Sequence, residues 1–277
     1  MPTHEMARYA YPIIEVVGDE NVPTRDKRSR TSTLRLSLCE PNEPQTEAIT
    51  RWRRPTTVVE SVELPEKLDP NLVLLTAPEQ PAATSYRLLR HRLLSNGDPR
   101  VIAVTSPSDG DGKSTCALNL ALALGEDVGA RVALIEANLR RPSLAKSLGF
   151  TPSHCFAEQM SNLDSTTRPW VMTKLDGRRV ELASVDPSAP ERPKLDRVLL
   201  AAALKDLREE YNYIIVDTPA VLDSADVNLI SETVDGVVMV ARAKKTRRAA
   251  LRAAVEQLAP ARILGVVLLD STAKEVS

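Results

Sequence analysis

From about residue 80 onward, short apolar runs alternate with longer amphipathic stretches. The apolar runs predict buried β-strands at 100–105, 131–135, 213–216, 237–241 and 263–269. Between them, apolar residues recur every three or four positions, which predicts helices over 84–94, 113–124 and 195–210 and a further helix with Thr246 as its N-cap. Strands that are apolar along their whole length are buried on both faces. The pattern therefore predicts an α/β fold with a doubly wound, mostly parallel sheet and helices on both of its faces.

The first 78 residues follow a different pattern. Their apolar residues come in short clusters separated by proline, threonine, glutamate and arginine. A stretch of this composition buries too little apolar surface to offset the entropy lost on ordering. We therefore expect a flexible, largely disordered N-terminal region over 1–78 and one globular domain over 79–277. Within the first region, 72–75 is apolar enough to dock as a short extended segment.

Composition and charge narrow the class of protein. The formal net charge of the 277 residues is −1, which gives no electrostatic reason to expect nucleic acid as the main partner. The three cysteines have no metal-ligand spacing, and no apolar run reaches the roughly 18 residues that cross a bilayer. No apolar stretch of the signal-peptide kind follows the first residues. We expect a cytoplasmic protein that meets a membrane only through a partner.

One loop carries the pattern of a phosphate-binding site. Between the predicted strand 100–105 and the predicted helix 113–124, residues 105–115 read TSPSDGDGKST. A phosphate chain needs converging backbone N–H groups, the positive end of a helix and a flexible cation, and this loop offers all three. Glycines permit the tight turn, the lysine reaches the β and γ phosphates, and the serine hydroxyl binds Mg²⁺. The residues predicted to bind ATP or ADP are Asp109, Gly110, Asp111, Gly112, Lys113, Ser114 and Thr115.

The alternative for this loop is an ordinary connection with a solvated lysine. Pro107 stands where the usual motif has its first glycine, five residues before Gly112. The strand before the loop and the helix after it nevertheless favour the phosphate site, because this is the structural context that the motif requires.

A carboxylate at a second strand end supports the same interpretation. Asp217 directly follows the apolar run 213–216, at the edge of the sheet where parallel strands end. Alone, such an aspartate is more typical of a turn or a helix cap. With a phosphate loop upstream, we expect Asp217 to organise Mg²⁺ directly or through water.

From Ser85 to Leu269 the chain resembles the bacterial tyrosine kinases of polysaccharide synthesis and export. The phosphate loop of that family also lacks its first glycine. Residues 134–142, LIEANLRRP, resemble the family's second Walker motif, and residues 211–219, YNYIIVDTP, resemble its Walker B strand. The same superfamily contains the division-site and chromosome-partitioning ATPases. Ser108 stands where that other branch has a signature lysine, which makes a partitioning-type ATPase the less favoured alternative.

The resemblance implies a protein-tyrosine kinase with Lys113, Glu136, Asn138 and Asp217 in the catalytic positions and with Ser114, Glu136 and Asp217 around Mg²⁺. In the family, positions 136 and 138 are aspartates that help to hold the metal and to activate the incoming tyrosine hydroxyl. Glutamate keeps the charge, whereas asparagine cannot accept a proton. Two hypotheses follow: a kinase with a weakened catalytic pair, or a nucleotide-dependent scaffold that transfers little or no phosphate.

The resemblance also implies partners. A membrane-anchored polysaccharide co-polymerase, which regulates chain length, would hold the chain peripherally at the inner membrane. Family members form homo-oligomeric rings through a Glu-x-x-Arg-x-x-Arg motif, which appears here as Thr84, Arg87 and Arg90 and lacks the acid. Without the resemblance, the two arginines are a solvated helix face. The family's C-terminal tyrosine cluster is missing, so only Tyr9 and Tyr11 lie in a region expected to be flexible.

Two groups of basic residues are further candidates for the functional site. Arg140 and Arg141, after the second Walker motif, either stabilise phosphate charge or begin a solvated helix. A basic cluster over 244–248 follows the predicted strand 237–241. At that edge of the sheet it can line the nucleotide or an acidic surface of a partner, although such runs are usually solvated loops.

Overall fold

The elements are taken from a computed structural model, which describes residues 13–15, 57–162, 169–188 and 194–270. Within these ranges the strands are β1 (Ile13–Glu15), β2 (Thr57–Val62), β3 (Val101–Thr105), β4 (Val132–Glu136), β5 (Trp170–Leu175), β6 (Val180–Ala183), β7 (Tyr213–Asp217), β8 (Gly236–Arg242) and β9 (Ile263–Leu269). The helices are α1 (Val73–Thr76), α2 (Pro81–Ser95), α3 (Lys113–Leu124), α4 (Leu144–Leu148), α5 (Phe156–Ser161), α6 (Arg197–Leu207), α7 (Asp226–Ser231) and α8 (Arg248–Leu258), with a 3-10 turn, η1, at Val221–Asp223.

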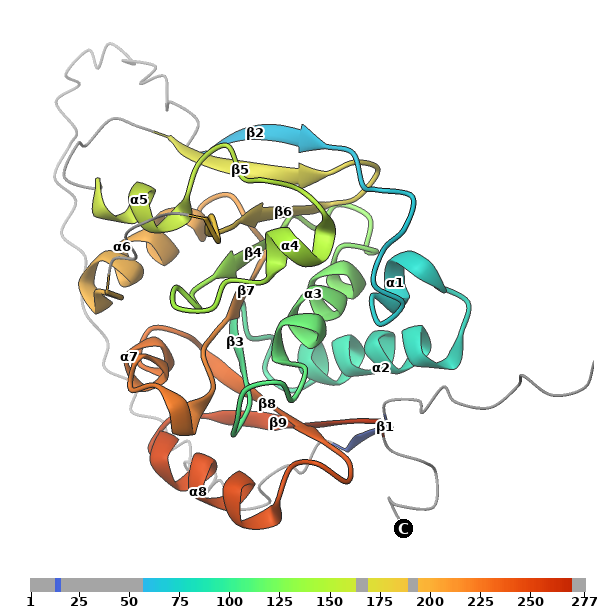
Figure 1. The fold of residues 1–277 in the computed structure, drawn as a ribbon, viewed down its shortest axis with the longest axis vertical. Helices are drawn as coiled ribbons and strands as arrows, with labels where there is room; N and C mark the ends of the chain where they lie inside the picture. The colour runs from blue at the N-terminus through green and yellow to red at the C-terminus, as the bar shows by residue number, and fades with distance from the viewer. Residues whose placement is uncertain (1–12, 16–56, 163–168, 189–193, 271–277) are drawn as a thin grey trace, which may run out of the picture.

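All of the described strands join one sheet in the order β1-β9-β8-β3-β7-β4-β6-β5-β2 (Figure 1). The run from β9 to β6 is parallel throughout. Antiparallel pairs occur only toward the edges of the described sheet, where β1 pairs with β9 and β5 with β6. The predicted doubly wound, mostly parallel sheet is therefore confirmed.

Two apolar cores lie on opposite faces of the sheet, because successive side chains of a strand point to opposite sides. Ile102 and Val104 of β3 belong to the core shared with α1, α2 and α3, whereas Val101 and Ala103 belong to the core shared with α5, α6 and α8. Figure 1 shows these two groups of helices on opposite sides of the sheet. Every residue of β3 and β4 is buried as a result, which explains why both strands are apolar up to their last residues, Thr105 and Glu136.

The predicted strands and the long helices match their predictions closely, whereas α4, α5, α7, β5 and β6 were not foreseen. The predicted helix over 113–124 is α3, with the same bounds. The expected N-cap role of Thr246 is wrong, because its hydroxyl accepts a hydrogen bond from the backbone N–H of Arg242 at 2.8 Å and α8 begins after Arg247. Among the described residues, no helix is both long and apolar enough to cross a membrane.

The folded part of the chain begins well before residue 79. Thr57–Val62 forms β2, which pairs in parallel with β5, and the segment at 72–75 is the short helix α1 rather than an extended piece. Leu72 and Leu74 are 1% and 2% exposed, because both pack into the core beside α3. The expectation of a flexible region over 1–78 is therefore wrong for residues 57–78. Residues 1–12 and 16–56 lie outside the described residues.

A buried asparagine ties this early segment to the helix that follows the phosphate loop. Asn119 of α3 is fully buried, and its Oδ1 accepts a hydrogen bond from the N–H of Leu74 at 3.1 Å. Its Nδ2 donates to the carbonyl oxygens of Asn71 and Thr115, each at 2.9 Å. The hydrogen bond with Leu74 is buried, so the Asn119 side chain satisfies a backbone N–H of α1 that water cannot reach. The two part-buried bonds join the segment before α1 to α3.

We predict that Asn119→Leu lowers the free energy of unfolding by about 1–3 kcal/mol, because it keeps the branched shape of the side chain but leaves a buried N–H without a partner. Urea unfolding measures the loss, and hydrogen exchange should show faster exchange at Leu74. The matched control is Asn71→Ala, which removes only a surface contact with Asp69. Equal stability of the two variants would contradict the assigned role of Asn119.

Candidate functional site

The sheet topology brings the candidate residues to one edge. After β3 the chain crosses to β4, and β7 later inserts between these two strands. In register, Val104 of β3 and Glu136 of β4 both lie opposite Asp217 of β7. The loop after β3 therefore shares the carboxyl edge of the sheet with Glu136 and Asp217. Ligands of open parallel sheets bind at such an edge, where neighbouring strands connect in opposite directions.

Two glycines give the loop its shape. Gly110 and Gly112 have φ angles of +81° and +96°, in the left-handed region that residues with a Cβ rarely adopt. A Cβ at Gly112 would also lie 2.6 Å from Cδ1 of Leu269, and one at Gly110 would lie 2.8 Å from Nζ of Lys245. Gly112 directly precedes α3, so the unpaired N–H groups of the first helical turn face the loop.

The lysine of the loop is paired with an acid of the same loop. Nζ of Lys113 lies 3.0 Å from Oδ1 of Asp109, and Arg141 donates a hydrogen bond to the other oxygen of that carboxylate. Partial burial raises the pKa of Asp109, but the hydrogen bonds and charges of Lys113 and Arg141 outweigh it and hold the pKa below its usual value. Asp109 is thus an ionised group between two cations.

Asp217 is the reverse case, a buried acid without a hydrogen bond. It is fully buried, and within the described chain neither carboxylate oxygen has a hydrogen-bond partner. Burial raises the pKa of Asp217 to about 7, although the charge of Lys113 and the neighbouring Ser114 hydroxyl act in the opposite direction. Leaving such a group unpaired is costly, so the arrangement is typical of a site that completes itself with a cation.

The donors around Asp217 fit Mg²⁺. This ion prefers oxygen ligands and is commonly bound by one or two carboxylates together with substrate phosphates rather than by an all-protein cage. Asp217 supplies the carboxylate, Ser114 supplies a hydroxyl, and the loop leaves the remaining positions to phosphate and water. The described residues contain no cluster of three or more His, Cys, Asp or Glu side chains that could hold a metal alone.

Glu136 faces the same edge but has its oxygens occupied. Its Oε1 accepts hydrogen bonds from the N–H groups of Ser143 and Leu144, the latter at 2.9 Å, and its Oε2 accepts one from Val185 at 2.9 Å. Burial raises the pKa of Glu136, and these backbone donors partly offset that rise. Glu136 therefore caps the start of α4 and holds the segment after β6. Its contact with Mg²⁺ stays a prediction.

Asn138 also has a structural role. Its Nδ2 donates to the carbonyl oxygen of Arg141 at 3.0 Å, and its Oδ1 accepts from the N–H of Arg141 at 3.3 Å. The side chain thereby closes the turn that carries Arg141 toward Asp109. Its place in catalysis stays a prediction.

Lys245, of the basic cluster after β8, contacts the phosphate loop. Its Nζ donates to the carbonyl oxygen of Gly110 at 2.7 Å and lies 3.9 Å from Oδ1 of Asp111. Asp111 is 1% exposed, and its Oδ2 has no hydrogen-bond partner among the described residues. Because 135 residues separate Lys245 from Gly110, no local pattern predicts this contact. The basic composition of 244–248 was the signal in the sequence that pointed to it.

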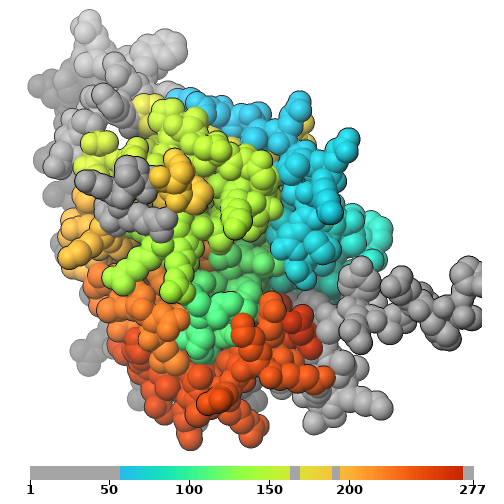
Figure 2. Space-filling model, in the orientation of Figure 1, coloured from blue at the N-terminus to red at the C-terminus, as the bar shows by residue number. Residues whose placement is uncertain are grey.

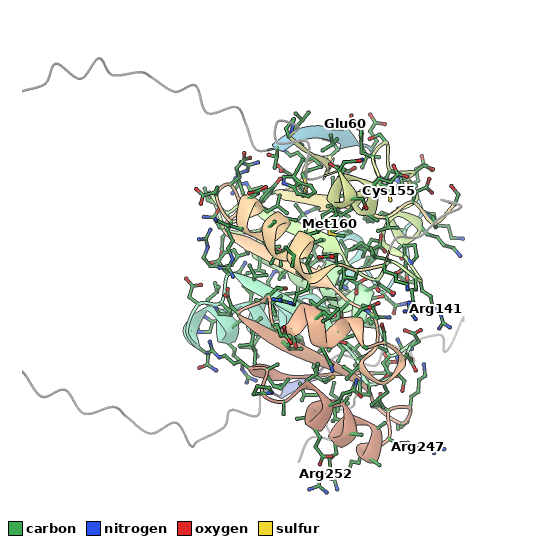
Figure 3. All side chains as sticks on the ribbon, turned by 90° about the vertical axis from the view of Figure 1, so that its left-hand side faces the viewer. Glu60, Arg141, Cys155, Met160, Arg247 and Arg252 are labelled. Carbon is green, nitrogen blue, oxygen red and sulfur yellow. The ribbon has the colours of Figure 1, made fainter. Side chains whose placement is uncertain are left out.

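Figures 2 and 3 show how the segments around the phosphate loop lie at the surface. In Figure 2, the green surface of the segment that includes the phosphate loop lies between the yellow-green surface of the segment after β4 and the orange-red surface of the segment after β8. Figure 3 shows Arg141 and Arg247 on the same side of the molecule, each pointing outward. The Arg141 side chain is 75% exposed, so solvent reaches the site from this side.

The two arginines predicted to form an oligomer interface have partners within the chain. Arg87 donates to both carboxylate oxygens of Glu126, at 2.6 to 3.1 Å. Arg90 donates to the carbonyl oxygen of Ala123 at 2.6 Å and lies 3.3 Å from Asp127. Both hold α2 against the carboxyl end of α3, where a cation is favoured by the helix dipole. Their role between subunits stays a prediction.

A glycine loop between a buried strand and a helix, with a buried lysine and a carboxylate at the end of the neighbouring strand of the sheet, is the arrangement of a P-loop NTPase domain. The ParA family model, described as NUBPL iron-transfer P-loop NTPase, matches residues 99–268. The chain belongs to this family of ParA-like P-loop NTPases.

The relatives and solved structures that the chain resembles include bacterial tyrosine kinases. The chain is 27% identical over 213 residues to tyrosine-protein kinase YwqD of Bacillus subtilis (strain 168), which covers 73% of this chain and 86% of that protein. It is 26% identical over 215 residues to the succinoglycan biosynthesis transport protein ExoP of Rhizobium meliloti (strain 1021), covering 74% of this chain but only 27% of ExoP. The kinase domain of VpsO superposes with a TM-score of 0.57 at 29% identity, covering 68% of this chain and 93% of that domain. The resemblance to bacterial tyrosine kinases of polysaccharide synthesis and export is confirmed.

The raised pKa of Asp217 generates a prediction about stability. Between pH 3.8 and about 7 the folded protein holds a proton on Asp217 that the unfolded chain releases, so stability falls as the pH rises through this window. We predict that Asp217→Asn is more stable than the parent protein above pH 7, by on the order of 3 kcal/mol, because it removes a buried charge. The difference should vanish at pH values below the ordinary pKa of an aspartate.

Thermal unfolding of both proteins across this pH range, without nucleotide or metal, measures the effect. Glu256→Gln is the control, because Glu256 is exposed and its pair with Arg252 lies on the surface of α8. A constant difference between Asp217→Asn and the parent protein at all pH values would show that Asp217 does not titrate as proposed.

Proposed function

We propose that the chain binds Mg²⁺ with ATP or ADP at the loop 109–115 and acts as a protein-tyrosine kinase in the synthesis or export of a surface polysaccharide. The observation that carries the proposal is the fully buried, unpaired carboxylate of Asp217 beside the loop that holds Lys113. The names of the relatives support the kind of reaction and the cellular process.

In this proposal the loop residues bind and orient the phosphates. The N–H groups at the start of α3 and the ammonium of Lys113 hold the β and γ phosphates, which is the usual task of such a loop. Ser114 and Asp217 would hold Mg²⁺, which neutralises phosphate charge when it is bound. Phosphoryl transfer depends mostly on such positioning and electrostatic stabilisation. A site with these parts retains most of what the reaction requires.

Removal of the proton from the incoming tyrosine hydroxyl is the step for which the site offers the fewest suitable groups. Asn138 cannot accept a proton and is hydrogen-bonded to the backbone of Arg141, while the oxygens of Glu136 accept three backbone hydrogen bonds. The geometry therefore favours slow transfer. Tyr86 and Tyr211 are 3% and 1% exposed, and the partly exposed Tyr213 begins β7, at the other end of that strand from Asp217. We therefore expect an acceptor from outside the folded core. Tyr9 and Tyr11, the acceptors expected from the sequence, lie outside the described residues.

A second candidate is a nucleotide-dependent scaffold with little or no phosphate transfer. It is favoured by the same hydrogen bonds, which give Glu136 and Asn138 structural roles in place of catalytic ones. In this case the exchange of ATP for ADP changes the contacts that the chain makes with a partner. For both candidates we propose a membrane-anchored polysaccharide co-polymerase as that partner and a peripheral location at the membrane. The Thr84, Arg87 and Arg90 positions are proposed to contribute to a homo-oligomer.

We predict that Lys113→Ala abolishes nucleotide binding, because it removes the cation that reaches the β and γ phosphates. The purified protein is titrated with Mg-ATP and Mg-ADP by calorimetry and is then incubated with labelled Mg-ATP, with phosphotyrosine and ADP measured together. Lys205→Ala, at an exposed position on α6, is the matched control and should bind as the parent protein does. Undiminished binding by Lys113→Ala would rule out the site.

We further predict that Asn138→Asp separates the two candidates. A restored carboxylate beside the phosphate loop should raise phosphotyrosine formation at least several-fold if proton transfer limits a kinase, since a positioned general base contributes about 10²- to 10⁴-fold. Lys113→Ala in the same background must remove the signal. Nucleotide binding without phosphotyrosine in either protein supports the scaffold.

A further inference from the structure

The ion pair between Lys113 and Asp109 has a consequence for the selectivity of the site. The phosphate-binding lysine and the acid that holds it belong to the same loop, four residues apart, with Nζ and Oδ1 separated by 3.0 Å. Arg141 is hydrogen-bonded to the second oxygen of the same carboxylate. Both oxygens of Asp109 are therefore engaged by cations at the place where an anionic ligand is expected.

We propose that Asp109 is an internal anion that competes with the phosphate chain for Lys113 and sets the preference of the site between ADP and ATP. The proposal rests on the proposed function, because it assumes that Lys113 binds phosphate. A nucleotide must take the ammonium of Lys113 away from Asp109 before it can bind. Asp109 then stays close by on Arg141 and repels the phosphate that lies nearest to it.

Burial makes this competition stronger than at an exposed ion pair. The side chain of Lys113 is 8% exposed and that of Asp109 is 28% exposed, so water screens their interaction poorly. By contrast, the Arg141 side chain is 75% exposed and can follow Asp109 outward. The Asp109 carboxylate is ionised throughout the neutral range, because the hydrogen bonds and charges of Lys113 and Arg141 outweigh its burial and lower its pKa.

The charge on the ligand decides the selectivity. The Mg²⁺ complex of ATP carries one more negative charge than that of ADP, and Lys113 reaches the β and γ phosphates. A fixed carboxylate beside Lys113 therefore opposes ATP more strongly than ADP. Other anions near the loop are less suited to this role. Asp111 faces Lys245 rather than Lys113, and Asp223 accepts a hydrogen bond from the backbone N–H of Asp109 at 3.2 Å.

The test is a comparison of dissociation constants for Mg-ADP and Mg-ATP in the full chain and in Asp109→Asn, which keeps the shape and removes the charge. We expect Asp109→Asn to bind Mg-ATP about tenfold more tightly, a change of about 1.4 kcal/mol. The gain for Mg-ADP should be smaller, so the ratio of the two dissociation constants shifts toward ATP. Because the effect is electrostatic, it should shrink as potassium chloride is added. A purely structural effect of the substitution would not depend on salt.

Controls make each outcome decisive. Glu256→Gln removes an acid on the outer face of α8 and should leave both dissociation constants unchanged. Asp109→Ala is the second variant, and thermal unfolding of both variants checks that the fold persists. If the parent protein binds nucleotide and Lys113→Ala does not, but the Asp109 variants match the parent protein, the competition by Asp109 is overturned and the proposed function stands. If none of the proteins binds nucleotide, the proposed function itself is overturned.

Discussion

The parallel pairing of β3 with β7 is the interaction on which the rest of the site depends. It brings the strand that leads into the phosphate loop and the strand that ends in Asp217 to one edge, with Val104 and Asp217 in register. Because β4 pairs with the other side of β7, Glu136 comes to the same edge. Helices bury both faces of these strands, so the polar side chains at their ends lie in a medium that screens charge weakly. The charge pairs of the site are a consequence of this position.

The acidic residues at this edge have different roles, because their surroundings differ. Asp109 lies between two cations and is ionised. Asp217 is buried without a hydrogen bond, and its pKa is raised to about 7. Glu136 has three backbone donors and holds the start of α4. Similar carboxyl groups thus become a competitor for the lysine, a candidate metal ligand and a helix cap, according to their neighbours.

The central fold could be predicted from the sequence because its signals are local. β3, β4, β7, β8 and β9 are apolar runs, and α3 follows the phosphate loop with the predicted bounds. The position of the loop and of Asp217 followed from strand ends. By contrast, β2 and α1 depend on contacts distant in sequence, with β5 and with Asn119, and their own composition is ambiguous. A propensity for helix or strand is a weak guide where tertiary contacts decide.

The same limit applied to individual side chains of the site. The sequence identified Lys113, Ser114 and Asp217 as candidates, because a known motif and a strand end carry them. It could not show that Glu136 faces α4 and Val185, since those donors follow Glu136 by between 7 and 49 residues. The pairing of Arg141 with Asp109 crosses 32 residues and depends on the turn that Asn138 closes. The type of each residue predicted what its side chain can do chemically. Which groups that side chain contacts depended on the fold.

The place of β2 at the end of the described sheet also determines how much of the chain the domain needs. A protein shortened to begin at residue 79 would lose β1, β2 and α1, and β9 and β5 would each become an open edge with unpaired N–H and C=O groups. It would also remove Thr57, which lies opposite Trp170 in the register of β2 and β5. Exposed edges of this kind pair with other chains. The boundary that composition favours therefore removes both end strands, whereas a protein that begins before Ile13 retains them.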